Sequence, residues 1–305
     1  MIHKAKKSLG QNFLKSEGAL RKIIEAGEIK PSDVILEIGP GKGALTGKLL
    51  EHALLVIAVE KDRELFEFLK NKFEKEIKTN TLMLVCEDIL EFDVSKAIRK
   101  AEQNVLERTL GRSGDDGQRK FSGENFRGES ENILLGLKSY KIIANIPYNI
   151  TGAILKKFLT GKHQPESMVL MVQHEVATRI IGNKPSSVLA TAGKKESILS
   201  ISVKAYGEPK MIGKVDKRYF SPEPKVNSAI IAIKNIPRKI FKENGVDEER
   251  FWEIVKAGFA HKRKKLSSNI KGSCQRVPLT SLGNKRAEDL SLSDWIELAK
   301  LPNNI

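Results

Sequence analysis

The segment Asn145-Ile146-Pro147-Tyr148 contains residue types that could activate an aromatic amine. N6 of adenine is a poor nucleophile because its lone pair is delocalised into the ring. Two hydrogen-bond acceptors at its N–H groups would draw it toward tetrahedral geometry, and the Asn145 amide oxygen and the Ile146 carbonyl could serve. Pro147 stops strand pairing beyond that carbonyl, and Tyr148 offers a stacking face to a base that has left its own stack. The alternative is an Asn-Pro turn with a half-buried tyrosine.

A glycine-rich segment, EIGPGKGALT at residues 37–46, joins an apolar run to a helical pattern. Such glycines allow a sharp turn and close approach of a ligand. Gly39, Gly41 and Ala44 satisfy the dinucleotide pattern G-x-G-x-x-G/A, in which a pyrophosphate lies at the helix N-terminus. Glu37, two residues before the first glycine, suits instead a ligand that carries cationic groups. A tight turn without a ligand is the third interpretation.

Two acidic residues follow the next two apolar runs. Glu60 is placed where a carboxylate can accept hydrogen bonds from both ribose hydroxyls of NAD or of another adenosine cofactor. Asp88 could accept from the exocyclic amine of the cofactor adenine. Taken singly, Glu60 could be a solvated charge and Asp88 a helix N-cap. Together with the glycine loop they predict a ligand site at consecutive strand ends, and no hydride-transfer acid or base favours a dehydrogenase there.

Apolar runs alternate with helical patterns, which predicts an α/β fold with a parallel, doubly wound, Rossmann-like sheet. The expected strands lie at 34–39, 54–60, 81–90, 139–148, 166–173, 197–207 and 227–236. The helical patterns between them lie at 17–27, 41–53, 61–76, 151–160 and 175–181.

Residues 100–137 interrupt this alternation. The stretch is rich in glycine and in charges of both signs, and it predicts a flexible surface insertion. A segment that folds on binding RNA is the alternative, which its acidic residues disfavour. Only helical patterns follow Pro237. We therefore expect a catalytic domain at 1–236 and a small all-α domain at 237–305.

The chain of 305 residues has 53 Lys and Arg against 38 Asp and Glu, a net charge of +15. This excess suits a polyanion such as nucleic acid or an anionic membrane face, although a merely basic protein would show it too. No apolar run is long enough for a membrane span, and no secretory signal opens the sequence. Two cysteines and scattered histidines predict neither disulfides nor a metal site. We expect a cytoplasmic protein with Cys86 buried.

Taken together, the motifs resemble the bacterial small-subunit ribosomal RNA adenine N6,N6-dimethyltransferases, over nearly the whole chain except 100–137. The resemblance implies a class I methyltransferase that uses S-adenosyl-L-methionine (SAM). It implies SAM contacts in SLGQNFL (8–14), in the glycine loop and at the strand ends, namely Asn12, Leu14, Gly39, Gly41, Glu60, Asp88 and Asn145. It makes Asn145, Ile146, Pro147 and Tyr148 the catalytic motif. It also makes Phe220, in RYFSPEPKVNSAI, an aromatic residue that lines the target-base pocket.

The C-terminal segment FAHKRKKLSSN (259–269) resembles the basic helix of the small-subunit branch. Lys262, Arg263, Lys264 and Lys265 would form a positive patch for RNA phosphates, although a solvated helix face is the alternative. The resemblance implies dimethylation of N6 of two adjacent adenines near the 3′ end of 16S RNA, within an assembling 30S subunit. Nothing in the sequence demands more than a monomer. Three alternatives remain: a large-subunit resistance methyltransferase, an assembly factor that docks without methylating and, distantly, a dehydrogenase.

Overall fold

The computed structural model describes residues 5–6, 9–110, 139–182, 195–236, 239–271 and 282–301. The chain divides into two compact units, which are Met1–His174 with Ile212–Ala232, and Glu175–Met211 with Ile233–Ile305. The predicted boundary near residue 236 lies close to the last of these divisions. Residues 175–211, however, group with the C-terminal residues, so the expected domain boundaries stay a prediction.

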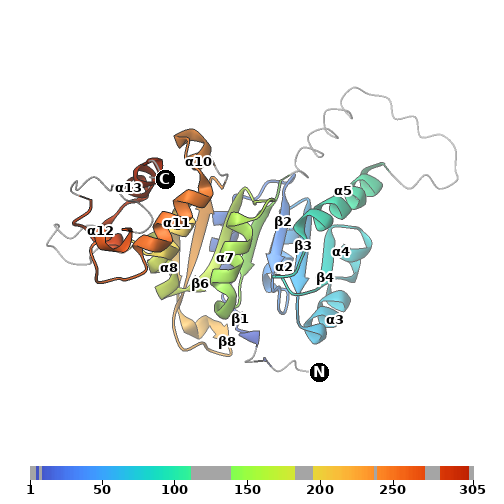
Figure 1. Cartoon of the computed structure of the whole chain (residues 1–305). Coiled ribbons are helices and arrows are strands. Elements are labelled where there is room, and N and C mark those ends of the chain that lie inside the picture. Colours follow the sequence, from blue (N-terminus) through green and yellow to red (C-terminus); the bar gives the residue numbers. More distant parts are fainter. Residues whose placement is uncertain are drawn as a thin grey trace. The chain divides into compact units, whose positions relative to one another are not determined.

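A seven-stranded sheet, visible in Figure 1, has the order β4-β3-β2-β5-β6-β9-β7. The pairs β4–β3, β3–β2, β2–β5 and β5–β6 are parallel, as the sequence predicted. The chain proceeds outward from β2 to β4 and then returns to place β5 on the other side of β2, so the strand order reverses between β2 and β5. Its strands are β2 (Val34–Ile38), β3 (Leu55–Glu60), β4 (Leu82–Cys86), β5 (Lys141–Asn145), β6 (Ser167–Gln173), β7 (Glu208–Val215) and β9 (Ser228–Lys234).

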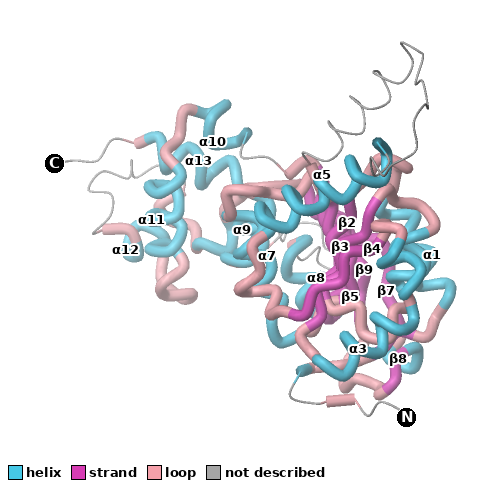
Figure 2. The backbone as a smooth tube through the Cα atoms, turned by 90° about the vertical axis from the view of Figure 1, so that its right-hand side faces the viewer, coloured by secondary structure: helices cyan, strands magenta, loops and turns pink. Residues whose placement is uncertain are grey.

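Helices cover both faces of this sheet, and Figure 2 shows α1 and α7 on opposite sides of the strands. Helix α1 begins after Ser16, whose hydroxyl accepts a hydrogen bond from Ala19 N at 3.2 Å, and it buries Leu20 and Ile23 in the core. The helices of this unit are α1 (Glu17–Gly27), α2 (Ala44–Leu50), α3 (Arg63–Lys72), α4 (Glu74–Lys78), α5 (Val94–Leu110) and α7 (Thr151–Thr160). A two-stranded antiparallel sheet joins β1 (Phe13–Leu14) to β8 (Phe220–Ser221).

The predicted insertion begins later than the sequence indicated. Residues 100–110 belong to helix α5, where Ala101 and Val105 are buried. Apolar residues at 94, 97, 98, 101 and 105 do recur at helical spacing, but the mixed charge around them led to the insertion being placed too early. The rest of the predicted insertion, from residue 111, lies outside the described residues.

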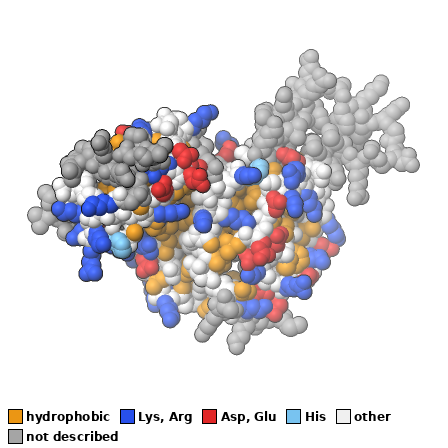
Figure 3. All heavy atoms as spheres, in the orientation of Figure 1, with side chains coloured by type: hydrophobic (Ala, Val, Ile, Leu, Met, Phe, Trp, Pro, Cys, Tyr) orange, Lys and Arg blue, Asp and Glu red, His pale blue; other side chains and the backbone are white. Residues whose placement is uncertain are grey.

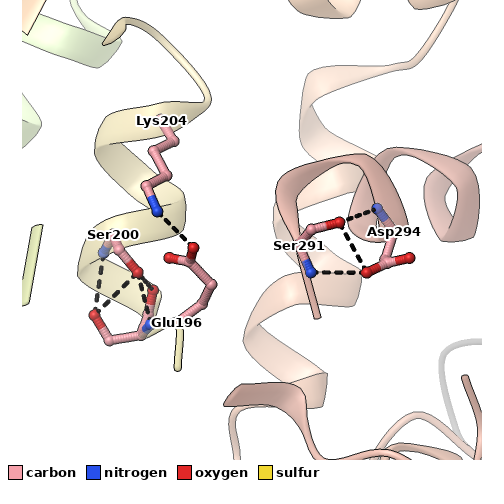
Figure 4. A network of polar contacts seen from close by, with 6 residues as sticks. Glu196, Ser200, Lys204, Ser291 and Asp294 are labelled. Carbon is pink, nitrogen blue, oxygen red and sulfur yellow. Dashed lines mark hydrogen bonds and ion pairs between the residues drawn. The ribbon is translucent and has the colours of Figure 1, made fainter. Parts of the chain in front are cut away.

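The predicted strand at 197–207 is wrong, because residues 198–204 form helix α9 (Ile198–Lys204). Its β-branched residues favoured a strand, but Ser197 and Ser200 form a reciprocal capping box that starts a helix. Figure 4 shows this cap with the ion pair between Glu196 and Lys204, and beside it the corresponding Ser291–Asp294 cap. Strand β7, which the sequence did not predict, follows α9.

The second unit is mainly helical. In its core the ring of Trp295 stacks on Phe259 with centroids 5.5 Å apart, and a Cβ at Gly258 would lie only 2.3 Å from that indole. Tyr206 stacks on Trp252 and contacts Phe241 edge-on. The other helices of the second unit include α8 (His174–Ile181, whose first residue is the last residue before the division at 174), α10 (Lys239–Asn244), α11 (Glu248–Gly258), α12 (Leu266–Asn269) and α13 (Leu292–Lys300).

Cys86 is exposed, so the expectation that it is buried is wrong. It is the last residue of β4, which forms one edge of the sheet. Within the described ranges, no helix is long and apolar enough to cross a membrane. Over the same residues, no group of three His, Cys, Asp or Glu side chains is arranged to hold a metal ion.

Candidate active site

A cavity of about 300 Å³ lies in the first unit, where the strand order reverses between β2 and β5. Open α/β sheets bind ligands at this position, at the carboxyl ends of the strands. The wall combines the glycine loop, the end of β3, the turn after β4, residues 145–148 and the N-terminal strap, which we define as residues 9–15. Every residue that the sequence predicted to bind the cofactor lies in this wall, namely Asn12, Leu14, Gly39, Gly41, Glu60, Asp88 and Asn145.

The glycine loop adopts backbone conformations that other residues rarely reach. Gly39 has φ +64° and Gly41 has φ +60°, both in the left-handed region. The Gly39 amide donates to Val59 O at 2.9 Å, which ties the loop to β3. A Cβ at Gly41 would lie 3.0 Å from the ring of Phe13 in the strap. The loop therefore brings bare backbone to the cavity wall.

Glu60 is buried, with 6% of its surface exposed, and two backbone amides hold its carboxylate. Oε2 accepts from Gly41 N at 3.1 Å and Oε1 accepts from Asp62 N at 2.9 Å. Burial raises the pKa of Glu60, and these hydrogen bonds oppose the shift. A carboxylate has about four acceptor sites, so about two remain for hydroxyl donors in the cavity.

The carboxylate of Asp88 already has two partners. Oδ2 forms an ion pair with Lys61 Nζ at 2.6 Å. Oδ1 accepts a hydrogen bond from Leu90 N at 2.9 Å, and this bond stabilises the turn that follows β4. The hydrogen bond from Lys61 is the main reason that the pKa of Asp88 is lowered. Asp88 is therefore ionised at neutral pH and can accept a further hydrogen bond from the cavity.

The amide of Asn145 is oriented by the N-terminal strap. Its Nδ2 donates to Asn12 O at 3.2 Å, which leaves Oδ1 as the acceptor end of the side chain. Asn145 ends β5 and Ile146 is buried next to it. Pro147, with φ −60° and ψ 131°, then turns the chain into the 3₁₀ helix η2 (Tyr148–Ile150). Residues 145–148 all line the cavity.

A second hollow, also of about 300 Å³, is lined by Gly10, Asn12, Tyr148, Asn149 and Gln173. Gly10, Asn12 and Tyr148 line both this hollow and the first cavity. The Tyr148 hydroxyl lies 2.5 Å from the hydroxyl of Ser228 in β9. Tyr148 therefore belongs to the walls of two adjoining spaces.

The N-terminal strap is tied down at several points. Asp62, whose side chain is only 1% exposed, accepts from Lys6 Nζ at 2.8 Å and from Gln11 Nε2 at 2.8 Å. Within the wall, Phe13 and Leu14 pair with β8, and Lys15 N donates to Tyr219 O at 2.8 Å. These contacts fix the strap as one wall of the cavity.

Glu37 is a buried acid in the wall, with 1% of its surface exposed. Burial is the main cause that raises its pKa to about 8; the neighbouring Thr46 hydroxyl and Lys72 oppose the shift, and the nearby Glu60 adds to it. Its Oε2 has no hydrogen-bond partner among the residues that the structure describes. The buried hydroxyl of Thr46, which also lacks a partner among these residues, is the neighbouring donor that acts on this carboxyl.

The model of the ribosomal RNA adenine dimethylase family matches residues 2–303. The chain belongs to this family. Its members are methyltransferases, and the α/β fold and the cavity at the strand ends agree with that assignment.

Curated relatives of this dimethylase cover nearly its whole length. It is 37% identical to ribosomal RNA small subunit methyltransferase A of Dehalococcoides mccartyi strain CBDB1, over 97% of this chain and 87% of the relative. It is 33% identical to the protein of the same name from Fusobacterium nucleatum, over 99% of this chain and 98% of the relative.

Solved structures also resemble this dimethylase. A dimethyladenosine transferase from Plasmodium falciparum aligns with a TM-score of 0.65 at 25% identity, over 94% of this chain and 95% of the other. The 23S rRNA methyltransferase ErmE aligns with a TM-score of 0.63 at 21% identity, over 95% of this chain and 98% of the other, which supports the fold.

Phe220, predicted as a catalytic residue, is not among the residues that line either cavity. Its side chain is 2% exposed and packs in the hydrophobic core, and its backbone pairs with Leu14. The expectation that it lines the target-base pocket stays a prediction. Its neighbour Ser221 lines the cavity instead, and Tyr219 is 48% exposed.

The predicted RNA-binding residues lie in the second unit of the dimethylase. Lys262, Arg263, Lys264 and Lys265 are all exposed, between α11 and α12, and Figure 3 shows Lys and Arg side chains gathered on the surface of this unit. Lys265 is the N-cap residue of α12, and its Nζ donates to Asn284 Oδ1 at 3.1 Å. The predicted basic helix is thus a turn that leads into a short helix.

Sequence reasoning missed several side chains that shape the site. Gln11 and Asp62 fasten the strap, Ser228 contacts Tyr148, and Gln173 lines the second hollow. Asp62 was discoverable as the N-cap of α3, since Asp before a helical pattern is a cap signal. Nothing in the local sequence around Ser228 points to Tyr148.

Proposed function

We propose that this dimethylase transfers methyl groups from SAM to N6 of two adjacent adenines near the 3′ end of small-subunit ribosomal RNA. The observation that carries the proposal is the shared wall: residues 145–148 line the cofactor cavity, and Tyr148 also lines the adjoining hollow. A methyl donor in one space and a base in the other would meet at this wall.

The cavity residues suit SAM. Glu60 has acceptor sites left for two ribose hydroxyls, and Asp88 can accept from an adenine amine. Glu37, beside the glycine loop, also belongs to the wall. Asn12 and Leu14 close the cavity from the strap, while Gly39 and Gly41 allow close approach. When bound, SAM supplies a methyl group that its sulfonium charge makes electrophilic.

Asn145 and Ile146 would activate the acceptor nitrogen. Asn145 Oδ1, oriented by the hydrogen bond to Asn12 O, and the Ile146 carbonyl accept from the two N–H groups of N6. This arrangement draws the nitrogen toward tetrahedral geometry and frees its lone pair. A cationic N6 is a strong acid that loses its proton to water, so no general base is required. Orientation supplies most of the rate gain.

RNA recognition involves both units in this proposal. The target adenine leaves its stack and lies on Tyr148, whose stacking is worth about 1–3 kcal/mol. The exposed cations at 262–265 bind backbone phosphates. We infer that a monomer acts in the cytoplasm on an assembling 30S subunit, which presents these adenines in accessible form.

The proposal is tested by incubating the protein with radiolabelled SAM and, separately, immature small subunits, mature large subunits and a DNA duplex. The nucleic acid is then digested and the labelled nucleoside identified. N6,N6-dimethyladenosine only with small subunits is the expected result. Label on large subunits would move the substrate to the other subunit. Subunit binding without any label would make the chain a docking factor.

A further inference from the structure

The hydroxyl of Tyr148 meets a buried hydroxyl from a remote strand. Ser228, at the start of β9, has no exposed surface, and its Oγ lies 2.5 Å from Tyr148 Oη. The two residues are 80 positions apart in the sequence. Both belong to the first unit.

The start of β9 is itself rigidly held. Asn227, the residue before Ser228, accepts from His174 N at 2.9 Å through its backbone carbonyl. Its side-chain Oδ1 accepts from Lys217 N at 3.0 Å. Ser228 is therefore anchored from the end of β6 and from the turn before β8, so its hydroxyl is a fixed point.

Tyr148 is held at both of its ends as a result. At the backbone end, Pro147 and the 3₁₀ helix η2 define its Cα position, and Thr151 Oγ1 donates to Tyr148 O at 3.1 Å. At the far end of the ring, Ser228 defines the position of the hydroxyl. Tyr148 lines both the cofactor cavity and the second hollow, so the tilt of its ring sets where a stacked base would lie.

We propose that Ser228 is a positioning residue for methyl transfer, which holds the Tyr148 ring in the plane on which the target adenine stacks. The proposal rests on the proposed function and adds to it a residue that touches neither cofactor nor substrate. A ring that is already ordered loses less freedom when the base binds, and a base in a defined plane presents N6 in one direction.

The test is a double-mutant cycle with Ser228→Ala and Tyr148→Phe, measured as kcat/KM on immature small subunits. Each single change removes the same hydroxyl–hydroxyl bond, so each should lower kcat/KM about three- to tenfold. The double variant should match the singles to within about twofold, because residues that act as a pair are not additive. Ser228→Cys, similar in size but a weak donor, should resemble Ser228→Ala. The Kd for S-adenosylhomocysteine should not change.

Three results would overturn the assignment. Multiplied effects in the double variant would show that Ser228 acts independently of the tyrosine. Wild-type kcat/KM in Tyr148→Phe would show that the bond does not matter, and this variant leaves β9 intact even if changes at Ser228 impair folding. An unchanged kcat/KM in a folded Ser228→Ala variant would also show that this bond does not matter for methyl transfer. A wild-type protein without activity on any RNA would instead reject the proposed function, while binding of S-adenosylhomocysteine reports separately on the cavity.

Discussion

The two halves of the active-site wall hold their polar side chains in different ways. The cofactor half consists of the glycine loop and the ends of β3 and β4. There the carboxylate of Glu60 accepts hydrogen bonds from the backbone amide of Gly41 in the glycine loop and from that of Asp62, two residues further along the chain. In the acceptor half, formed by residues 145–148, Asn145 bonds to Asn12 and Tyr148 to Ser228, at separations of 133 and 80 residues. One half is built mainly from neighbouring strand ends, the other from distant segments.

This difference implies a division of labour. Backbone amides hold the cofactor half, so changes to its carboxylates should alter ligand affinity without disturbing the base site. Side chains from remote segments hold the acceptor half, so changes there should alter turnover while cofactor binding persists. Single substitutions in each half test that separation.

Replacing Asn145 with Ala should lower kcat at least about 100-fold, as expected when a preorganised polar group is lost from a reacting centre. S-adenosylhomocysteine should still bind, because only the link to Asn12 O disappears from the cavity wall. Single-turnover methylation and calorimetry would measure the two effects. Undiminished turnover would remove Asn145 from the mechanism.

Replacing Glu60 with Gln should raise the Kd for S-adenosylhomocysteine about 10- to 100-fold, the usual range for losing hydrogen bonds to a charged group. At saturating cofactor, kcat should change little. Glu67→Gln, an exposed change on α3, is the matched control. A fall in kcat with unchanged affinity would contradict the division between the halves.

Replacing Gln11 with Ala should speed release of S-adenosylhomocysteine about three- to tenfold, because one of the bonds that fasten the strap to Asp62 is lost. The cap of Asp62 on Glu64 N remains, so α3 should keep its stability. Stopped-flow displacement measures the rate, with Gln103→Ala on the exposed face of α5 as the control. Equal release rates would mean that the strap does not limit exit.

Replacing Glu37 with Gln should make the free energy of unfolding depend less on pH. The folded protein raises the pKa of Glu37 from its ordinary value of 4.5 to about 8, so the folded state binds the proton more tightly than the unfolded state. The stabilisation is fully present below 4.5 and is lost as the pH rises through about 8. Thermal unfolding from pH 5 to 8 should show a smaller fall in Tm for the variant. Parallel curves would show that Glu37 does not titrate in this range.

Some parts of the fold follow from local sequence and were predictable. The runs that became β2, β3 and β5 are apolar along nearly their whole length, as strands buried on both faces must be. Residues 198–204 were mistaken for a strand because short β-branched runs fit either structure, and the capping box at Ser197 decided for a helix. Residues 100–110 were missed as helix although apolar residues at 97, 98, 101 and 105 follow the helical period, because the mixed charge around them also fits a solvated loop.

The sequence alone determined which residue types stand at the strand ends, and these residues form the cofactor half. The reason is that the carboxyl ends of parallel strands all lie at one edge of the sheet, so the position of a residue in its strand gives its position at that edge. Tertiary structure alone decided that Phe220 is buried against the core while Ser221 lines the cavity, since alternation along a strand assigns faces but not their surroundings. It also decided that Ser228 meets Tyr148 and that Gln11 meets Asp62. Such pairs depend on how distant segments pack, which no local pattern encodes.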